Sequence, residues 1–400
     1  MTLGQVVEVG PFHFTVIRIL VALGVCRVLV KRERISGGLR PLDKAMVGWA
    51  AWAVASSFFH EDIPATLVNH LGLVFDGLGF YFLLRVFISG SEGVWLAAKI
   101  VIILLVPVAL EMISEHFSGR DMFAVFGGMS ELSEVRGGKI RANGPFAHSI
   151  LAGTVGAVCM PLAFLFWRKN RKLCLLGIAA TGAMVVTSSS SGPILTTLFV
   201  LLGLGCWKIR ERMRLVRRMA VLIVVILNVI MDAPVYYLLA RIDLTGSSTG
   251  WYRSRLIEST ISHFNEWWLG GTDYTRHWMP TGVPWSPDHC DITNYYIRMG
   301  VLGGLPLMVL FIRVLVVAFQ TVGSGLRFRP DAPFEDRFMI WTLGAILFGH
   351  VATWMSVSYF DQTVVFLYLL LAAIGSLPVA PSRATHSVEA ATATFKESSG

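Results

Sequence analysis

Cationic side chains gather just before one of the long apolar stretches of this chain. Arg136, Lys139, Arg141 and His148 lie close together, and glycines occupy positions 137, 138 and 144 between them. Cations beside flexible glycines suit an anionic group such as a phosphate or diphosphate, because a guanidinium binds it through two parallel hydrogen bonds. The alternative is that these cations only contact lipid headgroups at a membrane surface.

A second polar cluster contains Arg253, Arg255 and Glu258. The stretch from Trp251 to Leu269 has the pattern of an amphipathic helix, with both arginines near its start. Arginines at that position oppose the helix dipole, which favours acidic groups there. An anionic ligand would resolve this conflict, and a salt bridge to Glu258 would resolve it equally well.

The third cluster contains Asp288, His289 and Asp291. A histidine exchanges protons near neutral pH, and a neighbouring carboxylate fixes its tautomer and raises its basicity. These are the requirements for activating a sugar hydroxyl as a nucleophile. The same three side chains form a thin ligand set for a divalent cation, so no metal and no cofactor is predicted. A purely structural histidine is the remaining alternative.

The elements that must position these clusters are long and apolar. Of the 400 residues, 54% are hydrophobic and only 15% are charged, whereas soluble domains average about 25% charged residues. The charges fall between apolar stretches that suit membrane-crossing helices. The sequence therefore predicts an all-α polytopic membrane protein of about eleven spans, in a single domain over residues 1–377. The stretches are 12–30, 45–59, 65–88, 94–113, 146–167, 173–187, 193–207, 219–240, 294–319, 338–357 and 360–377.

Basic residues set the predicted orientation. They concentrate after the first, fifth and seventh stretches, and such connections are cytoplasmic in most membrane proteins. The amino terminus is then outside and the carboxyl terminus inside, with residues 378–400 as a disordered cytoplasmic tail. The same bias accounts for the net charge of +8, so no nucleic-acid partner is predicted. No cleavable signal peptide is evident, and the five cysteines form no motif.

This orientation sends all three polar clusters to the outer face. Two large loops, 114–145 and 241–293, and a short serine turn at 188–192 are predicted there. The loop 241–293 is long and rich in aromatic residues, which favours a folded cap at the membrane surface. Some polar residues instead fall within the apolar stretches, and they are expected to face the bundle or a wet cavity. These are Arg18, Arg27, Asn69, His70, Asp76, Asp232 and His350.

Four segments in this order resemble motifs of the superfamily of O-antigen ligases and O-antigen polymerases. They are Arg141 to His148, Thr187 to Gly192, Arg253 to Gly271, and His289 to the glycines at 300–304. Two positions depart from the family pattern, since Ser191 stands where many members have arginine and Cys290 where asparagine follows the histidine. An odd number of spans is a further departure.

The resemblance implies a fold of the glycosyltransferase C type in the bacterial inner membrane. Members transfer a glycan from undecaprenyl diphosphate to another glycan or to lipid A–core in the periplasm, without a metal. By motif position, Arg141 and Arg253 would bind the diphosphate and His289 would orient or deprotonate the acceptor. Arg136, Lys139, Arg255, His148, Asp288 and Asp291 are expected substrate-binding residues. Membrane lipid and other polysaccharide-assembly proteins are expected partners.

Three classes of function stay open from the sequence, namely a glycosyltransferase, a transporter or flippase, and a structural or sensory scaffold. A ligase and a polysaccharide polymerase fit the four segments equally. A transporter or flippase for lipid-linked glycans would need charged residues along a path through the bilayer, whereas the densest clusters lie on one face. Internal repeats, which many transporters have, are not visible. A structural or sensory scaffold would leave Arg141, Arg253 and His289 dispensable.

Overall fold

A computed structural model describes residues 6–10, 12–241, 250–360 and 362–377, and these residues are mostly helical. Each of the apolar stretches predicted from the sequence coincides with a helix or contains most of one. These helices are α1 (Val16–Lys31), α2 (Pro41–Ser56), α3 (Ile63–Phe87), α4 (Gly90–Ser118), α5 (Ser149–Phe164), α6 (Arg171–Thr187), α7 (Ser191–Gly205), α8 (Met213–Ile230), α12 (Tyr295–Arg327), α13 (Phe334–Thr353) and α14 (Thr363–Ser376). The predicted tail, 378–400, lies outside the described residues.

Shorter elements occupy the connections. Two antiparallel hairpins are formed by β1 (Val6–Val9) with β2 (Phe12–Thr15) and by β3 (Glu134–Arg136) with β4 (Lys139–Arg141). The short α-helices are α9 (Leu238–Arg241), α10 (Gly250–Ser262) and α11 (Phe264–Trp267). Short 3-10 helices lie at Ser57–Phe59, Met122–Phe126, Cys206–Arg212, Val235–Tyr237 and Arg276–Trp278.

Three of the described helices are long and apolar enough to cross a membrane. They are α3, α4 and α12, while α5 and α14 are shorter apolar helices. A bilayer core is about 30 Å thick and needs about 20 apolar residues in a helix. These helices support the predicted association with a membrane by their length and composition.

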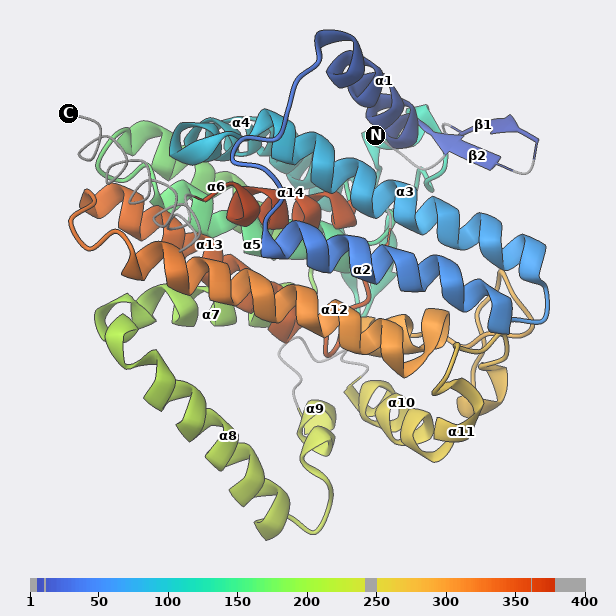
Figure 1. The fold of residues 1–400 in the computed structure, drawn as a ribbon. Coiled ribbons are helices and arrows are strands. Elements are labelled where there is room, and N and C mark those ends of the chain that lie inside the picture. The colour runs from blue at the N-terminus through green and yellow to red at the C-terminus, as the bar shows by residue number, and fades with distance from the viewer. Residues whose placement is uncertain (1–5, 11, 242–249, 361, 378–400) are drawn as a thin grey trace, which may run out of the picture.

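Apart from α8, which extends away from the bundle, the long helices lie side by side, so most connections gather at two ends of the bundle (Figure 1). We call one end the loop end, where His60 contacts Asp273 and Arg141 contacts Ser190. We call the other end the basic end, where the Arg168 guanidinium lies 3.5 Å from the Glu335 carboxylate. Arg40 donates to the carbonyl of Gly375 at that end, at 2.9 Å. Successive helices thus alternate in direction between the two ends.

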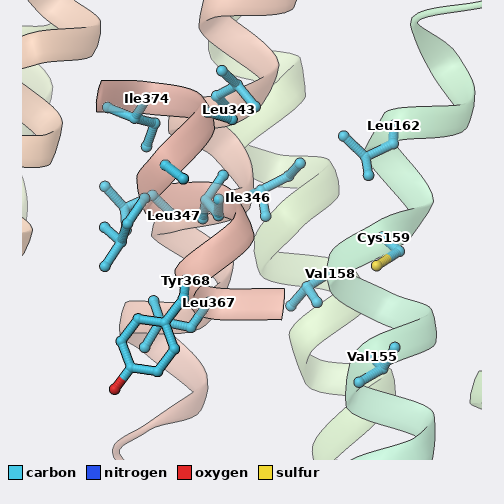
Figure 2. Close-up of a cluster of buried hydrophobic side chains, with 14 of the residues drawn as sticks. Val155, Val158, Cys159, Leu162, Leu343, Ile346, Leu347, Leu367, Tyr368 and Ile374 are labelled. Atoms are coloured by element: carbon cyan, nitrogen blue, oxygen red, sulfur yellow. The ribbon is translucent and has the colours of Figure 1, made fainter. Parts of the chain in front are cut away.

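The apolar core extends over most of the bundle, including α2, α4 and α12. Figure 2 shows its part between α5, α13 and α14, with side chains such as Val158, Ile346 and Leu367. Almost every residue of α5 is buried, because α6 and α7 also pack against it. Small residues such as Gly153 and Gly156 permit this, since a Cβ at Gly156 would lie 2.8 Å from the carbonyl oxygen of Thr181.

Four of the seven polar residues predicted within the apolar stretches form side-chain contacts in the bundle. Arg18 and Asp76 form an ion pair at 2.8 Å between α1 and α3. His70 hydrogen-bonds Ser57, and His350 hydrogen-bonds Tyr359, at 2.9 and 2.8 Å. Such pairs tie helices together at separate places in the bundle. Arg27, Asn69 and Asp232 were expected to face the bundle or a wet cavity, but all three are exposed.

Two predicted helices have different boundaries in the structure. The predicted stretch 219–240 is interrupted, because α8 ends at Ile230 and the chain then turns at Pro234, which has no N–H to continue a helix. The predicted helix from Trp251 to Leu269 is broken at His263, which separates α10 from α11.

Candidate functional site

The β3–β4 hairpin brings the first cationic cluster onto one surface. Gly137 and Gly138 form its two-residue turn with φ values of +57° and +73°, a conformation that glycine adopts readily. Arg136 pairs with Lys139 in this register, and Glu134 pairs with Arg141. Because side chains alternate along a strand and paired residues share a face, these four charged groups project from the same face.

Arg141 is the buried member of this face, with only 4% of its side chain exposed. Its Nη1 donates to Glu134 Oε2 at 2.7 Å, and its Nη2 donates to Ser190 Oγ at 2.8 Å. Its Nε–H is buried without a partner among the described residues. Burial lowers the pKa of Arg141, with Glu134 opposing and Arg136 reinforcing that shift. The guanidinium is therefore desolvated, and its Nε–H remains available to a ligand.

The serine turn at 188–190 holds the second strand of the hairpin. The N–H of Ala142 donates to the carbonyl of Thr187 at 3.1 Å, and Ser189 Oγ donates to the carbonyl of Ile140 at 3.0 Å. Ser189 adopts a φ of +46°, which is uncommon for a residue with a side chain. The first two motif segments, separated by two helices in sequence, are thus in direct contact.

His148 lies where this region enters α5. Its Nδ1 accepts a hydrogen bond from the N–H of Ile150 at 3.1 Å and so caps the helix. Burial lowers the pKa of His148, and Arg141 lowers it further. The imidazole is therefore neutral at physiological pH. Because Nδ1 is the acceptor, its Nε2 carries the hydrogen and is a donor.

Arg253 joins the same region from the loop 241–293, which we call the cap. It lies in α10, is partly buried, and its guanidinium donates to none of the described residues. Burial lowers the pKa of Arg253, the field of Arg136 lowers it again, and Asp291 opposes both. Arg136 therefore lies within electrostatic range of both Arg141 and Arg253. We call Arg136, Arg141 and Arg253 the arginine site.

Asp291 lies beside the arginine site. The hydroxyl of Tyr252, next to Arg253 in sequence, donates to the carbonyl of Asp291 at 3.0 Å. The side chain of Asp291 is exposed by surface area. Desolvation by the surrounding protein nevertheless raises the pKa of Asp291, and the charge of Arg253 opposes that shift. Asp291 is therefore a negative charge within electrostatic range of Arg253.

Glycines allow the backbone of the cap to pack closely against the bundle. The chain leaves the helical conformation at Gly303 and Gly304 within α12, and a Cβ at Gly304 would lie 2.3 Å from the carbonyl oxygen of Leu269. The N–H of Thr272 donates to the carbonyl of Val301 at 2.9 Å. The third and fourth motif segments therefore pack backbone against backbone.

The remaining predicted site residues are not in the arginine site. His289 lies in the same cap, where its Nδ1 bonds Ser286 Oγ at 2.7 Å rather than a carboxylate. Asp288 is exposed, and its carbonyl accepts from the N–H groups of Thr275 and Arg276. Arg255 forms the salt bridge with Glu258 that the sequence offered as an alternative. Lys139 is exposed and its amino group has no partner among the described residues.

Two residues of the site were not singled out by the sequence. Glu134 pairs with Arg141, and Ser190 holds it from the serine turn. A signal for Glu134 was present, because two three-residue strands around a Gly-Gly turn place it opposite Arg141. No local signal connects Ser190 with Arg141, because the contact depends on the packing of α5 against α6.

Two groups in the described part of the chain have ligand atoms close enough for a metal ion. Glu111, Glu115 and Asp121 form one, within 4.8 Å of one another. Glu115 is already used, since it accepts from Ser133 and from the N–H groups of Asn143 and Gly144. It therefore positions the segment that follows Arg141. The other group is His263, Glu266 and His277.

The arginine site combines three guanidinium groups, two of them with a buried Nε–H that has no partner among the described residues. Such a site can bind an oxyanion and stabilise charge that develops on it. No protein-family model matches the chain, and no curated protein matches it.

Proposed function

We propose that this protein is a glycosyltransferase that takes a glycan from undecaprenyl diphosphate at the outer face of the bacterial inner membrane. The observation that carries the proposal is the arginine site, where Arg136, Arg141 and Arg253 from two distant loops interact electrostatically. Two of these groups lose hydration and keep an unused Nε–H among the described residues. A diphosphate would supply both the charge and the acceptor atoms that they lack.

The same groups suit the diphosphate as a leaving group. In the reaction, an acceptor hydroxyl oxygen bonds to the anomeric carbon while the bond from that carbon to the diphosphate oxygen breaks. Negative charge grows on the departing diphosphate, and donors fixed in place stabilise it more than they stabilise the bound donor. Arg141 is held by Glu134 and Ser190, so little reorganisation is needed.

His289 is proposed to take the proton of the acceptor hydroxyl. In the tautomer whose Nδ1–H donates to Ser286 Oγ, at 2.7 Å, Nε2 has the free lone pair that accepts a proton. Asp288 and Asp291 lie on either side of it in sequence and would bind acceptor hydroxyls. His289 and the arginines would then act on opposite sides of the anomeric carbon.

The proposal includes a membrane topology of about eleven spans. The loop end carries the arginine site and the cap, and the basic end carries the arginine-rich connections (Figure 1). With the basic end cytoplasmic, the arginine site faces the periplasm. Arginine residues are uncommon in periplasmic loops of membrane proteins, and this supports a role for these three in binding an anionic ligand. A ligase with lipid A–core as acceptor and a polymerase with a second glycan as acceptor both fit this arrangement.

The test is complementation of a strain that lacks the gene, with membrane levels checked by blotting. We expect Arg141→Ala, Arg253→Ala and His289→Ala each to lower surface polysaccharide formation about 10²–10³-fold, the cost of removing one group that stabilises the transition state. Arg141→Lys should recover only part of the loss, because an ammonium cannot form the paired hydrogen bonds of a guanidinium.

Arg120→Ala is the matched control, since Arg120 is an exposed arginine near the same hairpin. We expect it to retain wild-type polysaccharide. The species that accumulates in the inactive variants identifies the reaction, because a polymerase defect leaves single repeat units attached and a ligase defect leaves unattached polymer. Wild-type polysaccharide in all three alanine variants would refute the proposal and favour a transporter.

A further inference from the structure

The cap contains a second group of side chains with the composition of a metal centre. His263 lies at the break between α10 and α11, Glu266 lies in α11, and His277 lies in the 3-10 helix Arg276–Trp278. Their ligand atoms lie within 4.8 Å of one another, and His277 Nε2 lies 2.9 Å from Glu266 Oε2. These three residues are called the two-histidine group below.

Neighbouring groups orient two members of the two-histidine group, His263 and Glu266. His263 Nδ1 lies 2.8 Å from the carbonyl oxygen of Ser259. A carbonyl can only accept, so Nδ1 carries the hydrogen and Nε2 keeps its lone pair. Trp278 Nε1 donates to Glu266 Oε2 at 2.9 Å. Metal-binding histidines and carboxylates in proteins are held by outer hydrogen bonds of this kind.

We propose that His263, Glu266 and His277 bind a divalent transition-metal ion of the Zn²⁺ type. Two imidazoles and one carboxylate are a common ligand set for zinc sites that leave one position to water. Zinc lies about 2.0–2.2 Å from such ligands, so tetrahedral ligand atoms are about 3.3 Å apart. The ligand atoms, all within 4.8 Å of one another, are close enough to share one ion. The side chains of Glu266 and His277 are 40% and 49% exposed, so an ion can enter from solvent.

The bound ion would stabilise the cap. Two ligands follow α10, the helix that carries Arg253, and the third lies next to Arg276, whose N–H donates to the carbonyl of Asp288 at 2.9 Å. An ion held by all three would fasten α10 to the segment before His289. Metal binding itself does not rest on the proposed glycosyl transfer, because it depends only on these three side chains and their neighbours.

The test uses the full chain in detergent, purified without a polyhistidine tag and stripped with a chelator. Zn²⁺ is titrated by calorimetry, and Co²⁺ by its visible absorption, which reports nitrogen ligands and coordination geometry. We expect one Zn²⁺ per chain, a higher melting temperature with Zn²⁺, and a loss of affinity of at least about 100-fold in His263→Ala and His277→Ala. Trp278→Phe keeps the ring but removes the N–H to Glu266, so we expect about 10–100-fold weaker binding.

The matched control is His116→Ala. The Nδ1 of His116 also faces a carbonyl, that of Ile140 at 3.2 Å, but no other described histidine or carboxylate completes a ligand set with it. This variant should bind Zn²⁺ as the wild type does. Glu266→Gln preserves the shape of the group and tests ligation if an alanine variant fails to fold. Unchanged Zn²⁺ affinity in His263→Ala, His277→Ala and Glu266→Gln would overturn the proposal.

Discussion

Arg141, which is buried, and Arg253, which is partly buried, show how single residues point to a ligand. A buried donor that forms no hydrogen bond costs about 1–3 kcal/mol relative to its hydrated state. Both Arg141 and Arg253 have such an Nε–H among the described residues. Burial also lowers the pKa of each group, which means that the folded protein disfavours their charged forms. A bound oxyanion would reverse both costs, and this argues against arginines that only contact headgroups.

His148 allows a prediction for pH at the residue scale. Burial and Arg141 lower its pKa below the ordinary value of 6.5. As pH falls below 6.5, the unfolded chain therefore binds a proton that the folded protein resists, and stability falls until pH reaches the folded pKa. We expect the melting temperature of the purified protein to drop between pH 7.5 and pH 5.5. One proton contributes at most about 1.4 kcal/mol per pH unit.

His148→Asn isolates this contribution. Asparagine caps a helix as well as histidine does here, but it does not titrate. We expect the variant to match the wild type near pH 8 and to lose less stability at pH 5.5. An equal drop in both proteins, measured by thermal unfolding in the same detergent, would show that His148 is not the group that responds.

At the scale of elements, the contact between the cap and α12 depends on glycines. Gly304 has a φ of +75°, and a Cβ there would lie 2.3 Å from the carbonyl oxygen of Leu269. We expect Gly304→Ala to destabilise the protein by about 2 kcal/mol or more, since both backbone strain and a clash oppose it. The melting temperature and the level of folded protein in the membrane are the measurements.

Gly323 provides the control within the same helix. A Cβ at that position meets no atom within 4 Å, so Gly323→Ala should leave stability unchanged or raise it slightly. If Gly304→Ala were as stable as Gly323→Ala, the backbone contact between the cap and α12 would not be what holds the cap in place.

The elements themselves were predictable to different degrees. Apolar stretches predicted the long helices well, because burial in the bundle and in lipid both require apolar residues over many turns. The break at His263 was not predicted, because no residue in the stretch from Trp251 to Leu269 is incompatible with a helix. The break after Ile230 had a signal in the sequence that the predicted stretch 219–240 did not take into account, since Pro234 cannot continue a helix.

The site was predictable as separate clusters but not as an assembly. The cationic clusters and the resemblance to the O-antigen ligase and polymerase motifs pointed to Arg141 and Arg253 as anion-binding residues, and the structure brings both within electrostatic range of Arg136. The partners Glu134 and Ser190 depend on strand register and on helix packing. The two-histidine group could not be predicted from the sequence, because His277 is separated from His263 along the chain and only the fold of the cap brings the two side chains together.

At the scale of the whole molecule, α8 indicates what surrounds the bundle. None of its residues is buried, and its apolar side chains, including Val221, Ile223 and Val225, are exposed. Arg214, Arg217 and Arg218 lie near its start, at the basic end. A helix this apolar would aggregate in water, whereas lipid would solvate it, with the arginines at the headgroups.

The orientation of the bundle is the last prediction, and it decides whether the arginine site meets a periplasmic substrate. Lys139 is exposed at the loop end, and Arg329 lies in the connection between α12 and α13 at the basic end. In a cysteine-free background that retains function, Lys139→Cys should react with a membrane-impermeant thiol reagent added to intact spheroplasts. Arg329→Cys should react only after the membrane is opened. The reverse pattern would place the arginine site in the cytoplasm, where the diphosphate donor would have to be bound before it crosses the membrane, and outer-face transfer would be excluded.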